Sequence, residues 1–93
     1  MQTSTQGTRS ETPCHRMPVL RRNDQQATAD DMVKVLQQLL NKSNCHLTAD
    51  GFFGAKTEAT VKQYQGKNRL IVDGIVGAKT WNALGACIII TEG

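Results

Sequence analysis

Two adjacent pairs of cysteine and histidine are the residues of this chain whose types could hold a metal ion. Cys14-His15 and Cys45-His46 supply thiols and imidazoles, the donors that zinc prefers. Zinc sites, however, usually separate paired ligands by two or more residues, so that both can reach one ion. With Cys87 the cysteine count is odd, which allows at most one internal disulfide and leaves its pairing open. We expect no metal site and no cofactor, a small buried thiol at Cys45 and free thiols elsewhere.

Catalytic chemistry has little support in the residue types. Both histidines directly follow cysteines, and no set of nucleophile, base and orienting group stands out. The carboxylates of Asp50 and Asp73 occupy equivalent places in a repeated motif, which favours a repeated structural role over an acid/base pair. The chain is therefore expected not to be an enzyme.

The charge of the chain is unevenly placed. The net charge is +3, and residues 1–23 hold four arginines against one glutamate, whereas residues 24–84 are nearly balanced. Nucleic-acid binding needs basic side chains concentrated on the surface that meets the phosphates. A nearly neutral folded part behind an arginine-bearing tail argues against a nucleic-acid partner.

No segment has the composition of a membrane span or an export signal. The longest strongly apolar run near the end, Ala86–Ile90, is far too short to cross a bilayer. Residues 1–18 are polar and lack an apolar core, so they do not read as a signal peptide. Because they also lack periodicity, we expect a disordered tail over residues 1–18, a folded domain over 19–86 and a C-terminal tail over 87–93.

An eight-residue segment occurs twice and organises the chain. Residues 50–57 read Asp-Gly-Phe-Phe-Gly-Ala-Lys-Thr and residues 73–80 read Asp-Gly-Ile-Val-Gly-Ala-Lys-Thr, with six of the eight positions identical. Asp-Gly favours a turn, because Asp can hydrogen-bond its own downstream backbone and Gly permits a positive φ. Two apolar residues follow, and then a Gly at the position of a helix N-cap. Each copy is therefore expected to form a turn, an apolar anchor and a helix start.

The apolar spacing predicts three helices. Met32, Val33, Leu36, Leu39 and Leu40 recur at three- and four-residue steps and indicate a helix that follows Thr28 and Asp31, a capping-box variant, and runs to about Lys42. A second helix follows the first copy of the repeat and ends near Asn68. A short third helix follows the second copy and stops at Gly85. The expected fold is all-α, with three helices and two repeated Asp-Gly turns.

With these elements in place, the chain resembles the peptidoglycan-binding-domain-like family. The resemblance runs from about residue 20 to residue 85 and rests on residues 33–40, 50–57, 61–65 and 70–84 in that order. It implies a three-helix, monomeric, non-catalytic module that binds cell-wall peptidoglycan, through the glycan or the stem peptide. It also implies an extracytoplasmic or wall-associated location and a tethered wall hydrolase or transpeptidase.

The chain departs from the family pattern at several helix ends. Asn44 and Arg69 stand where Gly is common after the first and second helices, and Gly66 lies inside the second helix. The stretch 23–30 before the first helix is longer than usual and lacks Gly. Asn enters the left-handed region more readily than most residues, whereas Arg does not. These departures affect loop shape and stability more than family membership.

Most of the repeated motif is expected to build the fold. The structural turn residues are Asp50, Gly51, Gly54, Asp73, Gly74 and Gly77, and we expect Gly54→Val or Gly77→Val to cost stability through the backbone. A surface for wall fragments needs amide and hydroxyl groups, one or two cations and an aromatic face. The candidates of these types around the turns and the second helix are Phe52, Lys56, Gln63, Tyr64, Gln65, Lys79 and Asn82.

The main alternative is a protein-interaction or regulatory module of the same fold that does not bind the wall. This fold also occurs as the prodomain of some metalloproteases, in which a cysteine blocks the zinc ion. Cys87 is followed by Ile-Ile-Ile-Thr and lacks the Gly and Asp that such a switch sequence requires. A scaffold role without the cysteine mechanism is therefore the alternative that remains.

Overall fold

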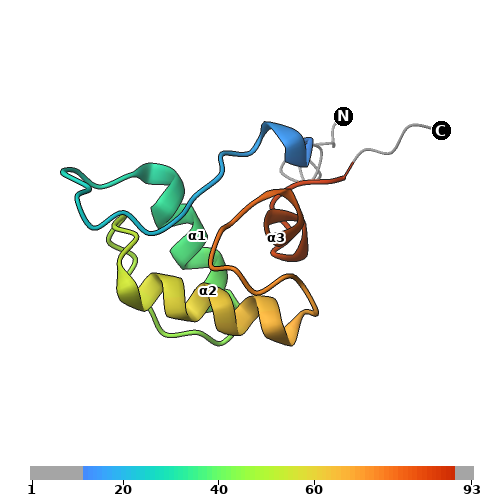
Figure 1. Cartoon of the computed structure of the whole chain (residues 1–93). Helices are drawn as coiled ribbons and strands as arrows, with labels where there is room; N and C mark the ends of the chain where they lie inside the picture. Colours follow the sequence, from blue (N-terminus) through green and yellow to red (C-terminus); the bar gives the residue numbers. More distant parts are fainter. Residues whose placement is uncertain (1–11, 90–93) are drawn as a thin grey trace.

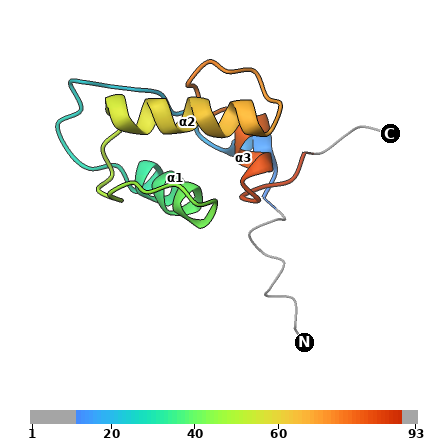
Figure 2. The same ribbon diagram turned by 90° about the horizontal axis from the view of Figure 1, so that it is seen from below.

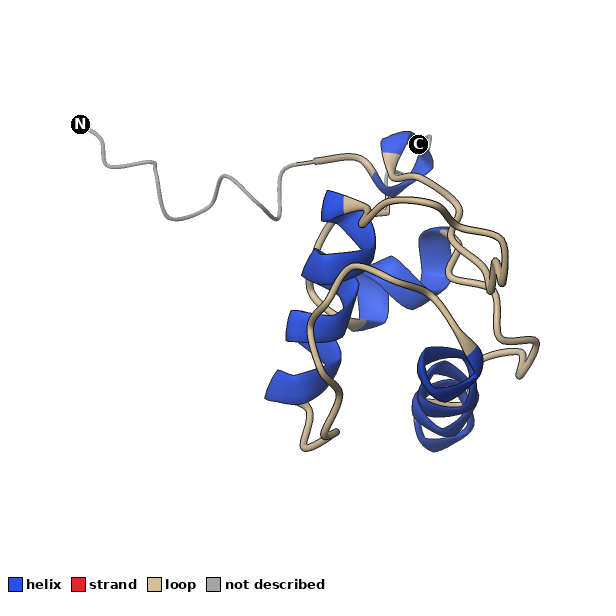
Figure 3. Ribbon diagram, turned by 90° about the vertical axis from the view of Figure 1, so that its left-hand side faces the viewer, coloured by secondary structure: helices blue, strands red, loops and turns tan. Residues whose placement is uncertain are grey.

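A computed structural model describes residues 12–89 of the chain. It contains three α-helices, α1 (Asp31–Lys42), α2 (Ala55–Lys67) and α3 (Ala78–Ala83), and a short 3-10 helix, η3 (Cys14–Arg16) (Figure 1). Long loops join the helices, and no strand forms within the described residues (Figure 3). The prediction of an all-α, three-helix fold is confirmed.

The first helix begins at a side-chain cap. A carboxylate oxygen of Asp30 accepts hydrogen bonds from the backbone N–H groups of Met32, at 2.7 Å, and Val33, at 3.3 Å. These bonds satisfy two of the amides that an α-helix leaves without partners at its start. The predicted capping box at Thr28 and Asp31 is therefore displaced by two residues, because Asp30 is the residue whose extended backbone aims its carboxylate at the first turn.

Glycine requirements in the two repeated turns differ from the prediction. Gly54 and Gly77 do cap α2 and α3, but both have extended backbones, and a Cβ atom added to either would meet nothing within 4 Å. The positive φ angles belong to Gly51 (82°) and Gly74 (75°), as the two Asp-Gly pairs predicted. The expectation that valine at Gly54 or Gly77 is costly is therefore wrong, because an extended backbone accepts any L-residue.

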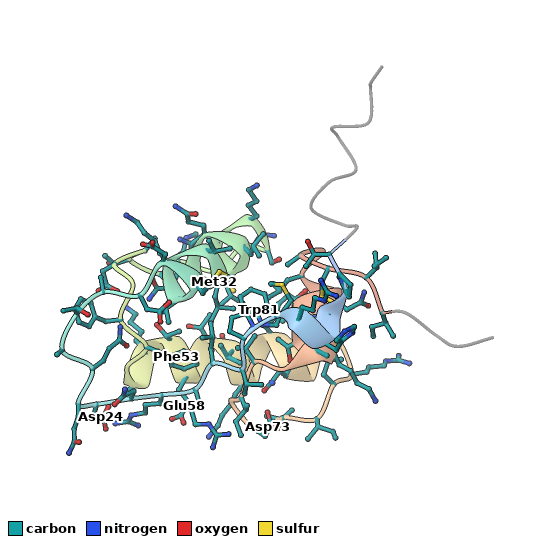
Figure 4. All side chains as sticks on the ribbon, turned by 90° about the horizontal axis from the view of Figure 1, so that it is seen from above. Asp24, Met32, Phe53, Glu58, Asp73 and Trp81 are labelled. Carbon is teal, nitrogen blue, oxygen red and sulfur yellow. A yellow bond between two sulfur atoms is a disulfide. The ribbon has the colours of Figure 1, made fainter. Side chains whose placement is uncertain are left out.

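The core lies between the three helices and is closed by the inner apolar residue of each turn. Phe53 and Val76 are fully buried against Leu36, Val61 and Trp81. Figure 4 shows Phe53 and Trp81 in the interior of the molecule, while Asp24 and Asp73 lie at its edges. The repeat thus inserts one anchor from each copy into a single core, as the sequence predicted.

An extended N-terminal segment ties the two turns together. Leu20 and Val76 exchange backbone hydrogen bonds of 3.1 and 2.8 Å, and the Asn23 N–H donates to the Phe53 carbonyl at 2.9 Å. The indole N–H of Trp81 donates to the Pro18 carbonyl at 2.7 Å. Each of these bonds joins a segment before α1 to the second half of the chain, so the segment holds both anchors in position.

The folded unit extends further in both directions than the predicted domain of residues 19–86. A disulfide joins Cys14 to Cys87, and η3 packs against α3 (Figure 2). Both cysteines are buried, and the 12–16 region bonds to Ile88 through the backbone. The expectation of free thiols at these two positions is therefore wrong, and residues 12–18 are not a tail; Cys45 is free and half-buried. The rest of the expected tails lies outside the described residues.

Candidate functional site

A buried glutamine braces the first turn. The Gln37 amide nitrogen lies at 3.2 Å from an Asp50 carboxylate oxygen, 3.0 Å from the Phe52 carbonyl and 3.1 Å from the Thr57 hydroxyl. The Gln37 carbonyl accepts from the Gly51 N–H at 2.9 Å. One side chain thus provides hydrogen-bond partners for backbone groups of the turn and for the Thr57 hydroxyl in the first turn of α2. Buried polar groups need such partners.

Gln65 braces the second turn in the same way. Its amide nitrogen lies at 3.0 Å from an Asp73 carboxylate oxygen, 2.9 Å from the Ile75 carbonyl and 3.3 Å from the Thr80 hydroxyl. Its carbonyl accepts from the N–H groups of Asp73 and Gly74, at 3.1 and 2.9 Å. Gln65 is 1% exposed. The sequence-based assignment of Gln65 as a ligand contact is therefore corrected: its amide is engaged within the fold.

The aspartates of the two turns are also engaged within their own turns. An Asp50 carboxylate oxygen accepts from the Phe52 N–H at 3.0 Å, and Asp73 accepts from the Ile75 N–H at 2.9 Å. The bond from Phe52, together with the bond from Gln37, lowers the pKa of Asp50 below its ordinary value, because both bonds favour the charged form. The carboxylates serve as turn braces.

Each braced turn borders a surface groove, and the two grooves correspond to each other. The first groove has a volume of about 290 Å³ and is lined by Gln37, Leu47, Thr48, Asp50, Phe52 and residues 54–57. The second groove has a volume of about 340 Å³ and is lined by Gln65, residues 69–71, Asp73, Ile75 and residues 77–80. The sequence repeat has therefore produced two similar surface features, each with a buried glutamine brace behind it.

The second groove differs from the first in its rim. Ile71 is 78% exposed and stands where the first groove has Thr48, and Arg69 adds a second cation to the one contributed by Lys79. The first groove has a single cation, Lys56. The second groove thus combines an exposed apolar rim with two cations, which is the composition that favours a small amphipathic ligand.

The seven candidate ligand contacts do not form one site. Phe52, which is 40% exposed, and Lys56 line the first groove, whereas Lys79 lines the second. Gln63 is exposed on α2 and lines neither groove. Asn82 also lines neither, and its amide donates to the Cys87 carbonyl at 3.0 Å. The structure therefore divides six of the candidates, with Gln65 behind the second groove, between the two grooves and two outlying positions, and the seventh lies in the core.

Tyr64 is a core residue. It is 7% exposed and packs in the same cluster as Leu36 and Trp81. Burial raises the pKa of the Tyr64 hydroxyl, and the neighbouring Cys45 adds to this effect. The sequence-based assignment of Tyr64 as a ligand contact is therefore corrected, because the ring is used to fill the interior.

Sequence reasoning missed both glutamine braces and the rim of the second groove. Gln37 precedes its aspartate by 13 residues and Gln65 precedes its aspartate by 8, so the loop lengths hide the correspondence. From the sequence, Arg69 is expected only as a departure at the end of the second helix, and Leu70 and Ile71 have no predicted role in a site. The departure from Gly at Arg69 was the one available signal.

Other kinds of site receive no support from the described residues. Over residues 12–89, no group of three or more His, Cys, Asp or Glu side chains lies close enough to hold a metal ion. In the same part of the chain, no helix is both long and apolar enough to cross a membrane.

Comparison with known proteins identifies the family. The model of the "Putative peptidoglycan binding domain" family matches residues 29–84. A protein from Kitasatospora aureofaciens, described as an uncharacterized protein in the bpoA1 3′ region, is 41% identical over 69 residues, which are 72% of this chain and 55% of that protein. The chain thus spans about half the length of this curated relative.

Two solved structures have a similar fold. One is a peptidoglycan-binding protein from Clostridioides difficile, in complex with glutamine hydroxamate, with a TM-score of 0.65 and 34% identity over 73% of this chain and 40% of that one. The other is the Burkholderia AP3 phage endolysin, with a TM-score of 0.65 and 34% identity over 75% of this chain and 25% of that one. With the family match, these likenesses show that the chain belongs to the peptidoglycan-binding domain family.

Proposed function

We propose that this chain binds bacterial cell-wall peptidoglycan without reacting with it, and that it holds an associated cell-wall enzyme against its substrate. The observation that carries the proposal is the second groove, which has a volume of about 340 Å³ and is lined by Ile71 and by the cations of Arg69 and Lys79. Sites for small ligands usually have volumes of roughly 300–1,000 Å³.

The chemistry of peptidoglycan matches this groove. Its peptide stems carry alanine methyl groups, amides and free carboxylates within a few ångströms of one another. An apolar rim can receive the methyl groups, and cations can pair with the carboxylates. The brace from Gln65 fixes the turn that carries Ile75 before any ligand arrives, which reduces the ordering cost of binding.

The absence of catalysis is supported by the use of the carboxylates near the grooves. Asp50 and Asp73 each accept hydrogen bonds from a glutamine and from the backbone of their own turns. General acid/base work would need a carboxylate aimed at a bound substrate. These two are aimed at the protein itself.

The role as a targeting module is supported by the lengths of the similar proteins. The matched part of the chain corresponds to 40% of the Clostridioides protein and to 25% of the phage endolysin. A module tethered to an enzyme raises the effective concentration of that enzyme at the wall, so modest affinity in a monomer is sufficient.

A location outside the cytoplasm is supported by the cysteines. The disulfide between Cys14 and Cys87 is buried, and such bonds persist mainly in oxidising compartments. The same bond argues against the prodomain alternative, because a disulfide-bonded Cys87 has no thiolate with which to block a zinc ion.

Co-sedimentation of the oxidised full chain with insoluble peptidoglycan tests the proposal. We expect saturable retention that persists at moderate salt, and we expect Ile71→Asp combined with Lys79→Gln to reduce it at least tenfold. Lys34→Gln is the matched control, because Lys34 is exposed on α1 and lines neither groove. Absence of retention by the wild-type chain would refute wall binding. Unchanged retention by the double variant would place the binding surface elsewhere.

A further inference from the structure

We infer that Arg69 is the specificity-determining residue of the second groove, and that the groove takes the free carboxylate of a peptide stem together with its small apolar side chains. The inference rests on the proposed function and names the part of peptidoglycan that this site recognises. Four features of Arg69 and its surroundings support it.

The backbone of Arg69 is in an unfavourable conformation. Its φ is 60°, and within the described residues Asn44, at 72°, is the only other non-glycine residue with a positive φ. L-residues with a Cβ atom are crowded in this left-handed region, and glycine is not. Asn is one of the residues that tolerate it, whereas a long side chain such as Arg has no local compensation.

Arg69 occupies a position after α2 whose counterparts after α1 and α3 are other residue types. Each of the three α-helices is followed by a residue of positive φ and then by an N–H that bonds back five residues: Cys45 to Leu40, Leu70 to Gln65 and Ala86 to Trp81. The left-handed residues are Asn44, Arg69 and Gly85. This helix ending is usually formed with Gly. Of the three, only the residue after α2 is large and charged. Its backbone strain is therefore found at the position whose side chain borders the second groove.

Within the part of the chain that the structure describes, the charge of Arg69 has no partner. Neither Arg69 nor Lys79 forms an ion pair or a side-chain hydrogen bond with any residue between 12 and 89, whereas Arg22 pairs with Asp24 and Glu58. The lining of the second groove has one acid, Asp73, against these two cations. The groove therefore has an excess of positive charge that complements an anion.

The apolar residues on the rim beside Arg69 restrict which anions would fit the second groove. Ile71 is largely exposed, and Leu70 is half-buried. An anion that also buries this rim must have apolar groups close to its charge. The planar guanidinium pairs with a carboxylate through two parallel hydrogen bonds.

The free carboxylates of peptidoglycan belong to its peptide part, which is therefore the part that Arg69 would recognise. The lactyl carboxyl group of muramic acid is consumed in the amide bond to the stem, so the free carboxylates belong to the peptide. Those at the C-terminus adjoin alanine methyl groups. The second groove is therefore complementary to a peptide end, and not to the neutral glycan.

NMR titration of the full chain tests the inference with defined probes. N,N′-diacetyl-L-lysyl-D-alanyl-D-alanine has one carboxylate, its C-terminal amide has none, and a chitin tetrasaccharide represents the glycan alone. We expect the acid to bind at least tenfold more tightly than the amide or the tetrasaccharide. We expect Arg69→Gly and Arg69→Asn to abolish the preference for the acid, because both remove the guanidinium and suit the left-handed backbone.

The matched control is Asn44→Gly, at the equivalent helix end outside both grooves. We expect Arg69→Gly to raise the melting temperature and Asn44→Gly to change it little, because Asn already tolerates the left-handed backbone. Only the Arg69 variants should lose affinity for the acid. Equal binding of acid and amide by the wild-type chain, or unchanged affinity in Arg69→Gly, would overturn the inference.

Wall co-sedimentation of the same variants separates the two proposals. Wild-type retention without any dependence on Arg69 or on the carboxylate would leave wall binding standing and would reject the peptide end as its target. Binding of the acid through Arg69, without retention on the wall, would support the inference and reject wall binding.

Discussion

Replacement of Gln65 by leucine is the sharpest test of how the second turn is held. Gln65→Leu conserves the approximate volume and removes every hydrogen bond that the amide makes. The Gly74 N–H loses its acceptor, and the Ile75 carbonyl and the Thr80 hydroxyl lose their donor. Gly74 and Thr80 are both buried, so these groups do not all regain a partner from bulk water.

The size of the effect follows from these lost partners. Each buried polar group left without a partner costs about 1–3 kcal/mol. Water entering from the groove can reach some of these groups, so we take the lower part of the range and expect a total loss of about 3–5 kcal/mol. A domain of this size has a free energy of unfolding of roughly 4–12 kcal/mol, so the variant should lose between about a quarter and all of its stability.

Urea unfolding of the oxidised chain measures this loss. The single tryptophan, Trp81, is fully buried and reports the transition by fluorescence. Gln63→Leu is the control, because Gln63 is exposed on the same helix and should change stability by less than about 0.5 kcal/mol. A loss below about 1 kcal/mol in Gln65→Leu would refute the idea that this amide braces the turn.

Three further perturbations test other parts of the fold. Reduction of the disulfide, which spans 73 residues of sequence, should lower stability by about 4 kcal/mol on the chain-entropy model, and an unchanged urea midpoint would contradict this. Gly51→Ala should cost about 2–4 kcal/mol, because φ is 82° and the new Cβ would lie 2.9 Å from the Ala29 Cβ, whereas Gly54→Ala, in open space, should not lower the melting temperature. Asp50 has a lowered pKa in the fold, so its stabilising effect should be complete above its ordinary value of 3.8 and be lost as the pH falls through the lower folded-state pKa. Asp50→Asn should therefore remove part of the acid sensitivity in unfolding measured from pH 7 to pH 2, and an identical pH profile would count against this role.

The sequence identified the architecture because the relevant signals are local. The Asp-Gly turns, the apolar anchors Phe53 and Val76 and the Gly residues before α2 and α3 each act within a few residues of one another. Apolar spacing over one helix likewise fixes which face is buried. Such features can be read from neighbouring residue types, and they were sufficient to predict three helices and the family.

The candidate site was only partly predictable, because residue type does not reveal exposure. Gln63 and Gln65 are both glutamines on α2, yet one is exposed and the other is buried as a brace. Their difference depends on which side of α2 faces the second turn. The sequence places Lys79 near a turn. The other cation of the second groove, Arg69, is ten residues earlier in the chain, and only the fold of the loop brings the two to one groove.

The sequence by itself determined the repeat, the helix starts, the inner anchors and the family, since each depends on short-range turn chemistry and periodicity. Only the tertiary structure decided the pairing of Cys14 with Cys87, the use of two glutamines as braces and the meeting of Arg69 and Ile71 at one groove. The physical reason is that these features depend on contacts between segments separated by loops of unequal length. Their geometry is fixed when the segments pack around the common core.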